Sequence, residues 1–122
     1  LDEKEKINRK VKKNLNFKKS NILIIGGGSS VKNRLNYIKE YLIKNPDIFI
    51  IFSSSRNLDL FKKVKNKSLI CITGNEISKI ESLDNSSIVA ILLEPIQGEG
   101  GIKHFETEFL SQLRLICEQK NW

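Results

Sequence analysis

Four short runs of apolar residues, rich in isoleucine, divide the chain. They are Ile22–Ile25, Ile48–Phe52, Leu69–Ile72 and Ile88–Leu93. Unbroken apolar runs of this kind are typical of strands that are buried on both faces of a parallel sheet. We therefore expect four strands, and Gly, Ser, Asn and Pro residues at their borders are consistent with turns.

Between these runs, apolar residues recur every three or four positions, which is the spacing of an amphipathic helix. The positions are Val31, Leu35, Ile38, Tyr41 and Leu42, then Leu58, Phe61 and Val64, and finally Phe105, Phe109, Leu113, Ile116 and Cys117. Pro46 predicts that the first helix ends near Asn45. Ile7, Val11 and Leu15 give the same spacing before the first strand. The alternation predicts a layered α/β fold of βα repeats, Rossmann-like and incomplete, with a mostly parallel sheet and right-handed crossovers.

The length of 122 residues corresponds to one domain or less. No apolar run approaches the roughly 20 residues needed to cross a bilayer, so we expect no membrane span. The charged beginning does not resemble a secretory signal. Because the chain contains no methionine, we expect it to be an excerpt of a longer protein.

The net charge is +11 over residues 1–72 and −4 over residues 73–122. We therefore expect a basic segment 1–72, with a helix and a βαβ(α)β unit, followed by an acidic segment 73–122. One α/β layer overall is an alternative, and so is a fusion of two coding segments near Thr73. Nucleic-acid binding is disfavoured, since 17 of the 21 basic residues are lysines and no aromatic residues alternate with them.

The two cysteines, Cys71 and Cys117, lie in apolar surroundings and are too few and too far apart for a zinc cluster. We expect both to be buried, reduced thiols, as in a cytoplasmic protein. No metal-ligand spacing occurs among the acidic residues.

A glycine-rich turn follows the first strand. Gly26, Gly27, Gly28, Ser29 and Ser30 precede a predicted helix, so their backbone N–H groups are candidates for binding the phosphate of a cofactor or other ligand. Either serine is also a candidate helix cap. The dinucleotide fingerprint is incomplete, because Val31 occupies its third glycine position, and the P-loop pattern is absent. The alternative is a tight turn in which glycine supplies positive φ.

Ser53, Ser54 and Ser55 follow the second strand and are expected to cap or turn the chain there. Arg56, beside them, is the best single anion-binding candidate of the basic segment. The stretch from about residue 18 to residue 72 loosely resembles the Rossmann-like segment after the barrel of aldolase-type, HMG-lyase-like proteins. The catalytic and metal residues of that family lie in the barrel, so the resemblance assigns none here.

A second motif follows the fourth strand, where Leu93-Glu94-Pro95-Ile96-Gln97-Gly98-Glu99-Gly100-Gly101 leads into the last helix. Ligands of open α/β sheets bind beyond the carboxyl ends of the strands, which is where Glu94, Gln97 and Glu99 are placed. Two carboxylates there are candidates for a general acid/base pair or a cation site. The alternative is that these residues only shape a turn.

This motif, with Phe109–Cys117 behind it, resembles class III pyridoxal-phosphate-dependent aminotransferases of the acetylornithine, ornithine and 4-aminobutyrate type, over about Asn85–Trp122. The resemblance implies that Glu99 is a gate residue holding a substrate-binding arginine. It also implies that Glu94 lies near the cofactor pocket, while Gln97 matches a motif residue without an assigned role.

A complete member of that family would bind pyridoxal phosphate, an amino acid and a 2-oxo acid, and would be a homodimer. In the family, the aspartate that pairs with the pyridine nitrogen and the Schiff-base lysine follow the matched helix. This chain contains neither segment. We therefore expect no catalytic residue and no transaminase activity in the chain alone. A non-catalytic domain that binds a phosphate-bearing ligand at Gly26–Ser30 is the alternative function.

Overall fold

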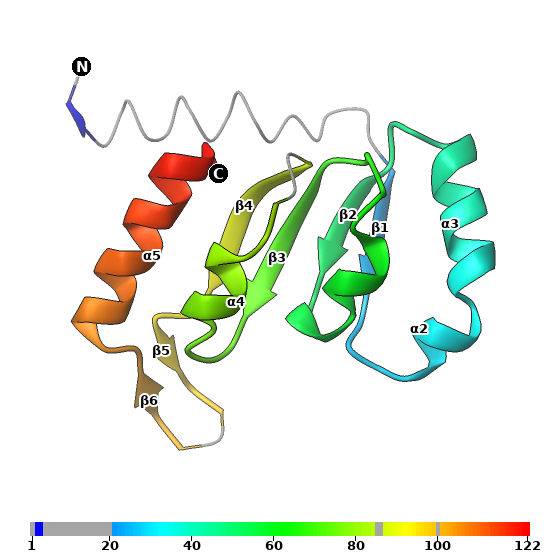
Figure 1. The fold of residues 1–122 in the computed structure, drawn as a ribbon. Coiled ribbons are helices and arrows are strands. Elements are labelled where there is room, and N and C mark those ends of the chain that lie inside the picture. The colour runs from blue at the N-terminus through cyan, green and yellow to red at the C-terminus, as the bar shows by residue number, and fades with distance from the viewer. Residues whose placement is uncertain (1, 4–20, 85–86, 100) are drawn as a thin grey trace.

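The computed structural model of the chain describes residues 2–3, 21–84, 87–99 and 101–122. All four predicted strands form, and they pair in parallel in the order β1-β2-β3-β4 (Figure 1). They are β1 (Ile22–Ile25), β2 (Phe49–Phe52), β3 (Ser68–Ile72) and β4 (Ile88–Leu93). The predicted layered α/β fold with a parallel, Rossmann-like sheet is confirmed.

In the described part of the chain, five helical elements connect or follow the strands. They are α2 (Ser30–Asn33), α3 (Leu35–Lys44), the 3₁₀-helix η1 (Ser55–Phe61), α4 (Ile77–Glu81) and α5 (Thr107–Lys120). The strands lie side by side in sequence order, so each connection crosses over in the same direction along the sheet. Right-handed crossovers then place all the connecting helices on one face of the sheet. In Figure 1, α3 and α5 lie at opposite ends of the sheet.

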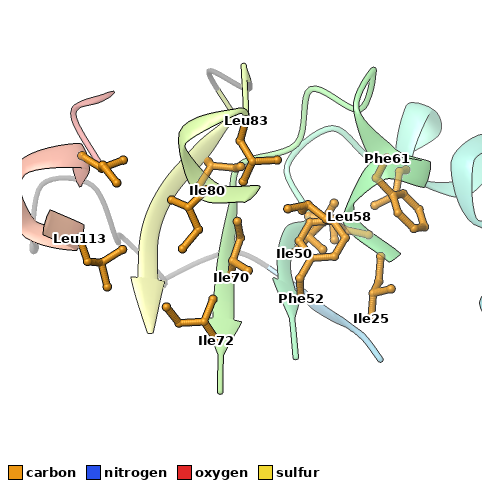
Figure 2. Close-up of a cluster of buried hydrophobic side chains, with 14 of the residues drawn as sticks. Ile25, Ile50, Phe52, Leu58, Phe61, Ile70, Ile72, Ile80, Leu83 and Leu113 are labelled. Atoms are coloured by element: carbon orange, nitrogen blue, oxygen red, sulfur yellow. The ribbon is translucent and has the colours of Figure 1, made fainter. Parts of the chain in front are cut away.

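The hydrophobic core lies between that face and the helices. Alternate strand residues such as Ile50 and Phe52 point into it, together with Leu42 of α3 and Phe61 of η1. The rings of Phe52 and Phe61 pack at an angle of 57° with centroids 5.6 Å apart. Figure 2 shows strand residues Ile25, Ile70 and Ile72 gathered in the same cluster as Leu58, Ile80 and Leu113.

The other face of the sheet is partly open. The expectation that all four strands are buried on both faces is wrong for β1 and β4: Ile22 is 49%, Ile24 65% and Leu92 58% exposed. The reason is topological. The sequential order makes β1 and β4 the edges of the sheet, and the crossovers cover only one face.

The helices differ from the predicted ones in their limits. Instead of one helix from Val31, α2 and α3 are separated by Arg34, whose φ of −113° and ψ of 10° are not helical. Val64 lies beyond the end of η1, and α5 begins at Thr107, although the ring of Phe105 still stacks on Phe109 at 4.7 Å. The short helix α4 was not predicted, because its sequence shows no clear periodic spacing of apolar residues. Ile7, Val11 and Leu15 lie outside the described residues.

The expected turn between Glu94 and the last helix is a small hairpin. Strands β5 (Ile96–Gln97) and β6 (Lys103–His104) pair antiparallel, with Ile96 opposite His104 and Gln97 opposite Lys103. Figure 1 shows this hairpin beyond the carboxyl end of β4. Gly101 in its loop has a φ of +85°, a conformation that favours glycine.

The two predicted segments, 1–72 and 73–122, meet between β3 and β4, which are neighbours in one sheet. The division into two segments stays a prediction. No helix among the described residues is long and apolar enough to span a membrane.

Candidate functional site

The polar loops singled out in the sequence all follow the carboxyl ends of parallel strands and so share one edge of the sheet. Gly26–Ser30 follow β1, Ser53–Arg56 follow β2, Thr73–Glu76 follow β3 and Glu94–Gln97 follow β4. The strand order separates the first from the last by three strand spacings, or about 14 Å. The structure therefore does not bring the glycine-rich turn and the Glu-Pro motif together.

The Glu-Pro motif is fixed against the loop after β3. The side-chain amide Nε2 of Gln97 donates to the carbonyl oxygen of Thr73 at 2.6 Å. The backbone N–H of Phe105 donates to the carbonyl oxygen of Pro95 at 3.3 Å and closes the base of the hairpin. The Gln97 bond attaches the hairpin to the loop after β3 at the sheet edge, so Gln97 positions the segment.

The two carboxylates of the motif are exposed. Glu94 Oε1 lies 4.0 Å from the position that a Cβ on Gly98 would occupy, so this carboxylate extends along the hairpin loop. Glu99 is in the loop itself, four residues before Lys103 of β6. Exposed carboxylates beyond a strand end are available to a cationic group that approaches the hairpin.

A cavity of about 240 Å³ lies between the hairpin, the loop after β3 and the start of α5. Gln97 lines it, as do Lys103, His104 and Phe109, and Thr73–Asn75 form the opposite wall. His104 lies in β6, beside Lys103. Lys103 and the Thr73–Asn75 wall were missed. Lys103 lies close to the Glu-Pro motif in the sequence, whereas Thr73 precedes Gln97 by 24 positions and gave no local signal.

The loops after β2 and β3 are tied together by polar contacts. The hydroxyl of Ser55 donates to the carboxylate of Glu76, and Lys79 Nζ donates to the carbonyl oxygen of Ser55 at 2.6 Å. Ser54 Oγ accepts from the backbone N–H of Arg56 at 3.3 Å and caps η1. The expected capping role is confirmed for Ser54, whereas Ser55 is the first residue of η1 and bonds to Glu76 instead.

The glycine-rich turn packs tightly on its own chain. The buried amide of Asn57 donates to the carbonyl oxygens of Gly26 and Gly28, at 2.8 and 3.1 Å. A Cβ on Gly27 would lie 2.9 Å from Ser54 Oγ. The expectation of positive φ here is wrong, because Gly101 is the one glycine with positive φ in the described part of the chain. Glycine is needed at position 27 for close approach of two loops.

The serines of this turn do not cap the helix through their side chains. Ser29 occupies the N-cap position of α2 with a helical φ of −67° and makes no side-chain cap bond, and α2 is only four residues long. The predicted Ser29 cap is therefore absent. Arg56 packs near the turn, its Cδ 3.4 Å from the position of a Cβ on Gly27, and its side chain is exposed.

Both cysteines are free and half-buried, so the expectation of full burial is wrong. Burial raises the pKa of the Cys71 thiol above its ordinary 9.0. It also raises the pKa of the Cys117 thiol, where nearby Glu118 adds to the effect and Arg114 opposes it. No three metal-ligating side chains gather among the residues that the structure describes.

The sequence of the chain matches the model of one protein family. The sequence model of "Aminotransferase class-III" matches residues 37–122. Over 57 residues the chain is 37% identical to the acetylornithine/succinyldiaminopimelate aminotransferase of Yersinia pestis. It is 40% identical over 47 residues to the succinylornithine transaminase of Yersinia enterocolitica, and 51% identical over 39 residues to the acetylornithine aminotransferase of Nitrosomonas europaea.

These alignments cover 47%, 38% and 32% of this chain and 14%, 11% and 10% of the three relatives. The chain thus spans only about a tenth to a seventh of their length. No solved structure matches. The resemblance of residues 18–72 to aldolase-type proteins stays a prediction.

Proposed function

The chain belongs to the class III aminotransferases, and from that membership we propose that it is the substrate-gate part of an enzyme that transfers an amino group between an ornithine-type amino acid and a 2-oxo acid. The hydrogen bond from Gln97 to Thr73 carries the proposal, because it holds the family motif at the carboxyl edge of the sheet. The names of the relatives support the substrate class.

In this proposal, Glu99 is the gate. It is an exposed carboxylate in the hairpin loop, so it can pair with an arginine from elsewhere in the enzyme and release it to a substrate carboxylate. Glu94 directly follows β4 and is assigned to the cofactor side of the site by this proposal, and Gln97 positions the hairpin that carries both carboxylates.

Pyridoxal phosphate is the cofactor of this family, and when bound it supplies the electron sink for amino-group transfer. The described residues do not fit a complete site for it. The Gly26–Ser30 turn, the candidate phosphate cradle, lies about 14 Å along the sheet edge from Glu94. Two of its carbonyl oxygens accept bonds from Asn57, and Gly27 packs on Ser54.

We therefore propose that the chain does not transaminate by itself. Mixed with pyridoxal phosphate and reduced with borohydride, it should give no stoichiometric adduct at a single lysine. One lysine trapped stoichiometrically would contradict this part of the proposal and leave the gate assignment intact.

A chimera tests the gate directly. Residues 85–122 replace the matching segment of the Nitrosomonas relative, and both half-reactions are measured. We expect the chimera to be active. The quantity to compare is kcat/KM for the amino donor divided by kcat/KM for the dicarboxylate substrate. Glu99→Gln should change this ratio by about tenfold, which corresponds to about 1.4 kcal/mol in one transition state.

Glu108→Gln is the matched control, since Glu108 is also exposed but lies in the first turn of α5, outside the motif. An active chimera in which both substitutions leave the ratio unchanged would refute the role of Glu99. A folded, cofactor-binding chimera without activity would refute the role of the whole segment.

The remaining parts of the proposal are a homodimeric complete enzyme and a cytoplasmic location. The free thiols of Cys71 and Cys117 support a reducing compartment. The excess of lysine over arginine argues against nucleic acid as a partner.

A further inference from the structure

A second cavity, of about 430 Å³, lies at the opposite end of the strands from the hairpin. One wall is the last part of α3 and the turn after it, and the other is the segment 63–66 between η1 and β3. Pro46 precedes β2 and Asn66 precedes β3, so this cavity is at the amino ends of the parallel strands. It is therefore separate from the candidate site.

The floor of this cavity is aliphatic. Among the described residues, Leu42, Ile43, Pro46 and Val64 line it and no aromatic side chain does. Leu42 is fully buried, whereas Ile43 is 77% exposed. An aliphatic ligand chain would cover Ile43 and gain burial of apolar surface, while a nucleobase would find no ring to stack on.

The one uncharged polar side chain among the described lining residues already makes hydrogen bonds. Asn66, 6% exposed, donates through Nδ2 to the carbonyl oxygens of Asn45 and Ile48 at 3.0 Å and of Pro46 at 3.3 Å. These bonds fix the two walls relative to each other, so the cavity is preformed. They also occupy the amide donors that would otherwise recognise a sugar or a base.

Three lysines supply the charge. Lys39, Lys63 and Lys65 line the cavity, and no acidic side chain does in the part of the chain that the structure describes. The two ion pairs of the described part of the chain, Lys62–Asp59 and Arg114–Glu118, involve none of these three. An ammonium group acts as a compact point charge that attracts an anion without demanding a fixed geometry.

We propose that this cavity binds a monomeric fatty carboxylate of medium chain length, with its tail over Leu42, Ile43 and Val64 and its head among the three lysines. The volume falls within the range of small-molecule pockets, about 300–1,000 Å³. A protein partner would need a surface of about 20–30 residues, far more than the cavity offers. The assignment does not depend on the aminotransferase function.

The test is a titration of the ¹⁵N-labelled chain with decanoate below its micelle concentration, followed by amide shifts. We expect shifts confined to residues 39–46 and 63–66 and a Kd on the order of 1 mM, as for a ligand of about 12 heavy atoms. Decanol and decylammonium should bind more weakly, and added salt should weaken decanoate binding.

Three variants sharpen the test. Lys63→Gln with Lys65→Gln should weaken decanoate binding by about fivefold or more, and Ile43→Asp should abolish it. Lys32→Gln, on α2 and away from the cavity, is the matched control and should change nothing. Because Ile43 and Lys32 are exposed, neither substitution should disturb folding, and unchanged amide spectra elsewhere verify this.

Equal binding of decanol or decylammonium, shifts outside the cavity, or no binding at millimolar decanoate would each overturn the proposal. So would sedimentation with phosphatidylglycerol vesicles in the absence of binding to monomeric decanoate, since that result identifies a lipid surface as the partner.

Discussion

The side-chain amide of Gln97 donates a 2.6 Å hydrogen bond to the backbone carbonyl oxygen of Thr73, 24 positions earlier in the chain. The bond connects the hairpin after β4 to the loop after β3. It explains why the Glu-Pro motif has a defined position although Glu94 and Glu99 are exposed.

Replacing Gln97 by Glu removes the donor and sets a carboxylate against the Thr73 carbonyl. Since a hydrogen bond contributes about 0.5–1.5 kcal/mol, we expect amide exchange in residues 96–105 to accelerate by about tenfold, with the core strands unchanged. Gln112→Glu, on the exposed side of α5, is the control and should leave exchange in the hairpin as it is. Unchanged hairpin exchange in both variants would show that the bond does not hold the segment.

Gly27→Ala should destabilise the fold. Its Cβ would lie 2.9 Å from Ser54 Oγ and 3.0 Å from Ser54 Cβ, and such overpacking costs about 1–3 kcal/mol. Gly74→Ala is the matched control, because nothing lies within 4 Å of the added Cβ, and its effect should stay within about 0.5 kcal/mol.

Urea denaturation of both glycine variants measures the difference in unfolding free energy. Adding Ser54→Gly to the Gly27→Ala chain should restore part of the loss, because it removes both clashing atoms. Equal stability of the two single variants would contradict the close approach of these loops.

Phe61→Ala should be among the most damaging single changes. Phe61 is 1% exposed and packs on Phe52, and loss of such a ring costs about 3–5 kcal/mol. Tyr37→Ala removes an aromatic ring that is exposed on α3 and should cost less than about 0.5 kcal/mol. Thermal unfolding followed by circular dichroism compares the two. A larger loss for Tyr37→Ala would contradict the placement of the core.

Because of the two thiols, we expect the free energy of unfolding to depend on pH in the alkaline range. Burial raises the pKa of Cys71 and Cys117 in the folded chain above the ordinary 9.0, so folding favours the neutral thiols. Their contribution to stability is present below pH 9.0 and is lost as the pH rises through the folded-state pKa values. The unfolding free energy should therefore fall more steeply above pH 9 in the parent chain than in Cys71→Ala/Cys117→Ala.

Alkylation by iodoacetamide measures the same shift independently. The rate in the native chain should rise with a midpoint above pH 9.0, and in the urea-unfolded chain with a midpoint near 9.0. Coincident profiles would contradict the raised pKa values.

Local sequence patterns were enough to locate the strands and to classify the fold. Runs such as Ile88–Leu93 are continuous apolar stretches bounded by polar residues, so their positions can be found from the local sequence. The Glu-Pro motif was equally recognisable, because Pro95 ends strand pairing directly after Glu94 and the glycines that follow permit a tight loop. Family membership, now supported by a match over residues 37–122, rests largely on such local identities.

Other features depend on contacts between distant residues. The division of the first helix at Arg34 and the hairpin of Ile96–Gln97 with Lys103–His104 have no strong periodic signal, since elements this short are stabilised by what they pack against. The role of Gly27 was misassigned to backbone conformation, because its neighbour Ser54 is distant in the sequence.

The sequence by itself determined that this chain forms parallel βα units and carries a class III aminotransferase motif, since both depend on local composition and spacing. Only the tertiary structure decided the order of the strands. That order places the glycine-rich turn and Glu94 at opposite ends of one edge and leaves Ile24 and Leu92 exposed. Strand order follows from side-chain packing across the whole sheet, and each apolar run alone is compatible with several neighbours.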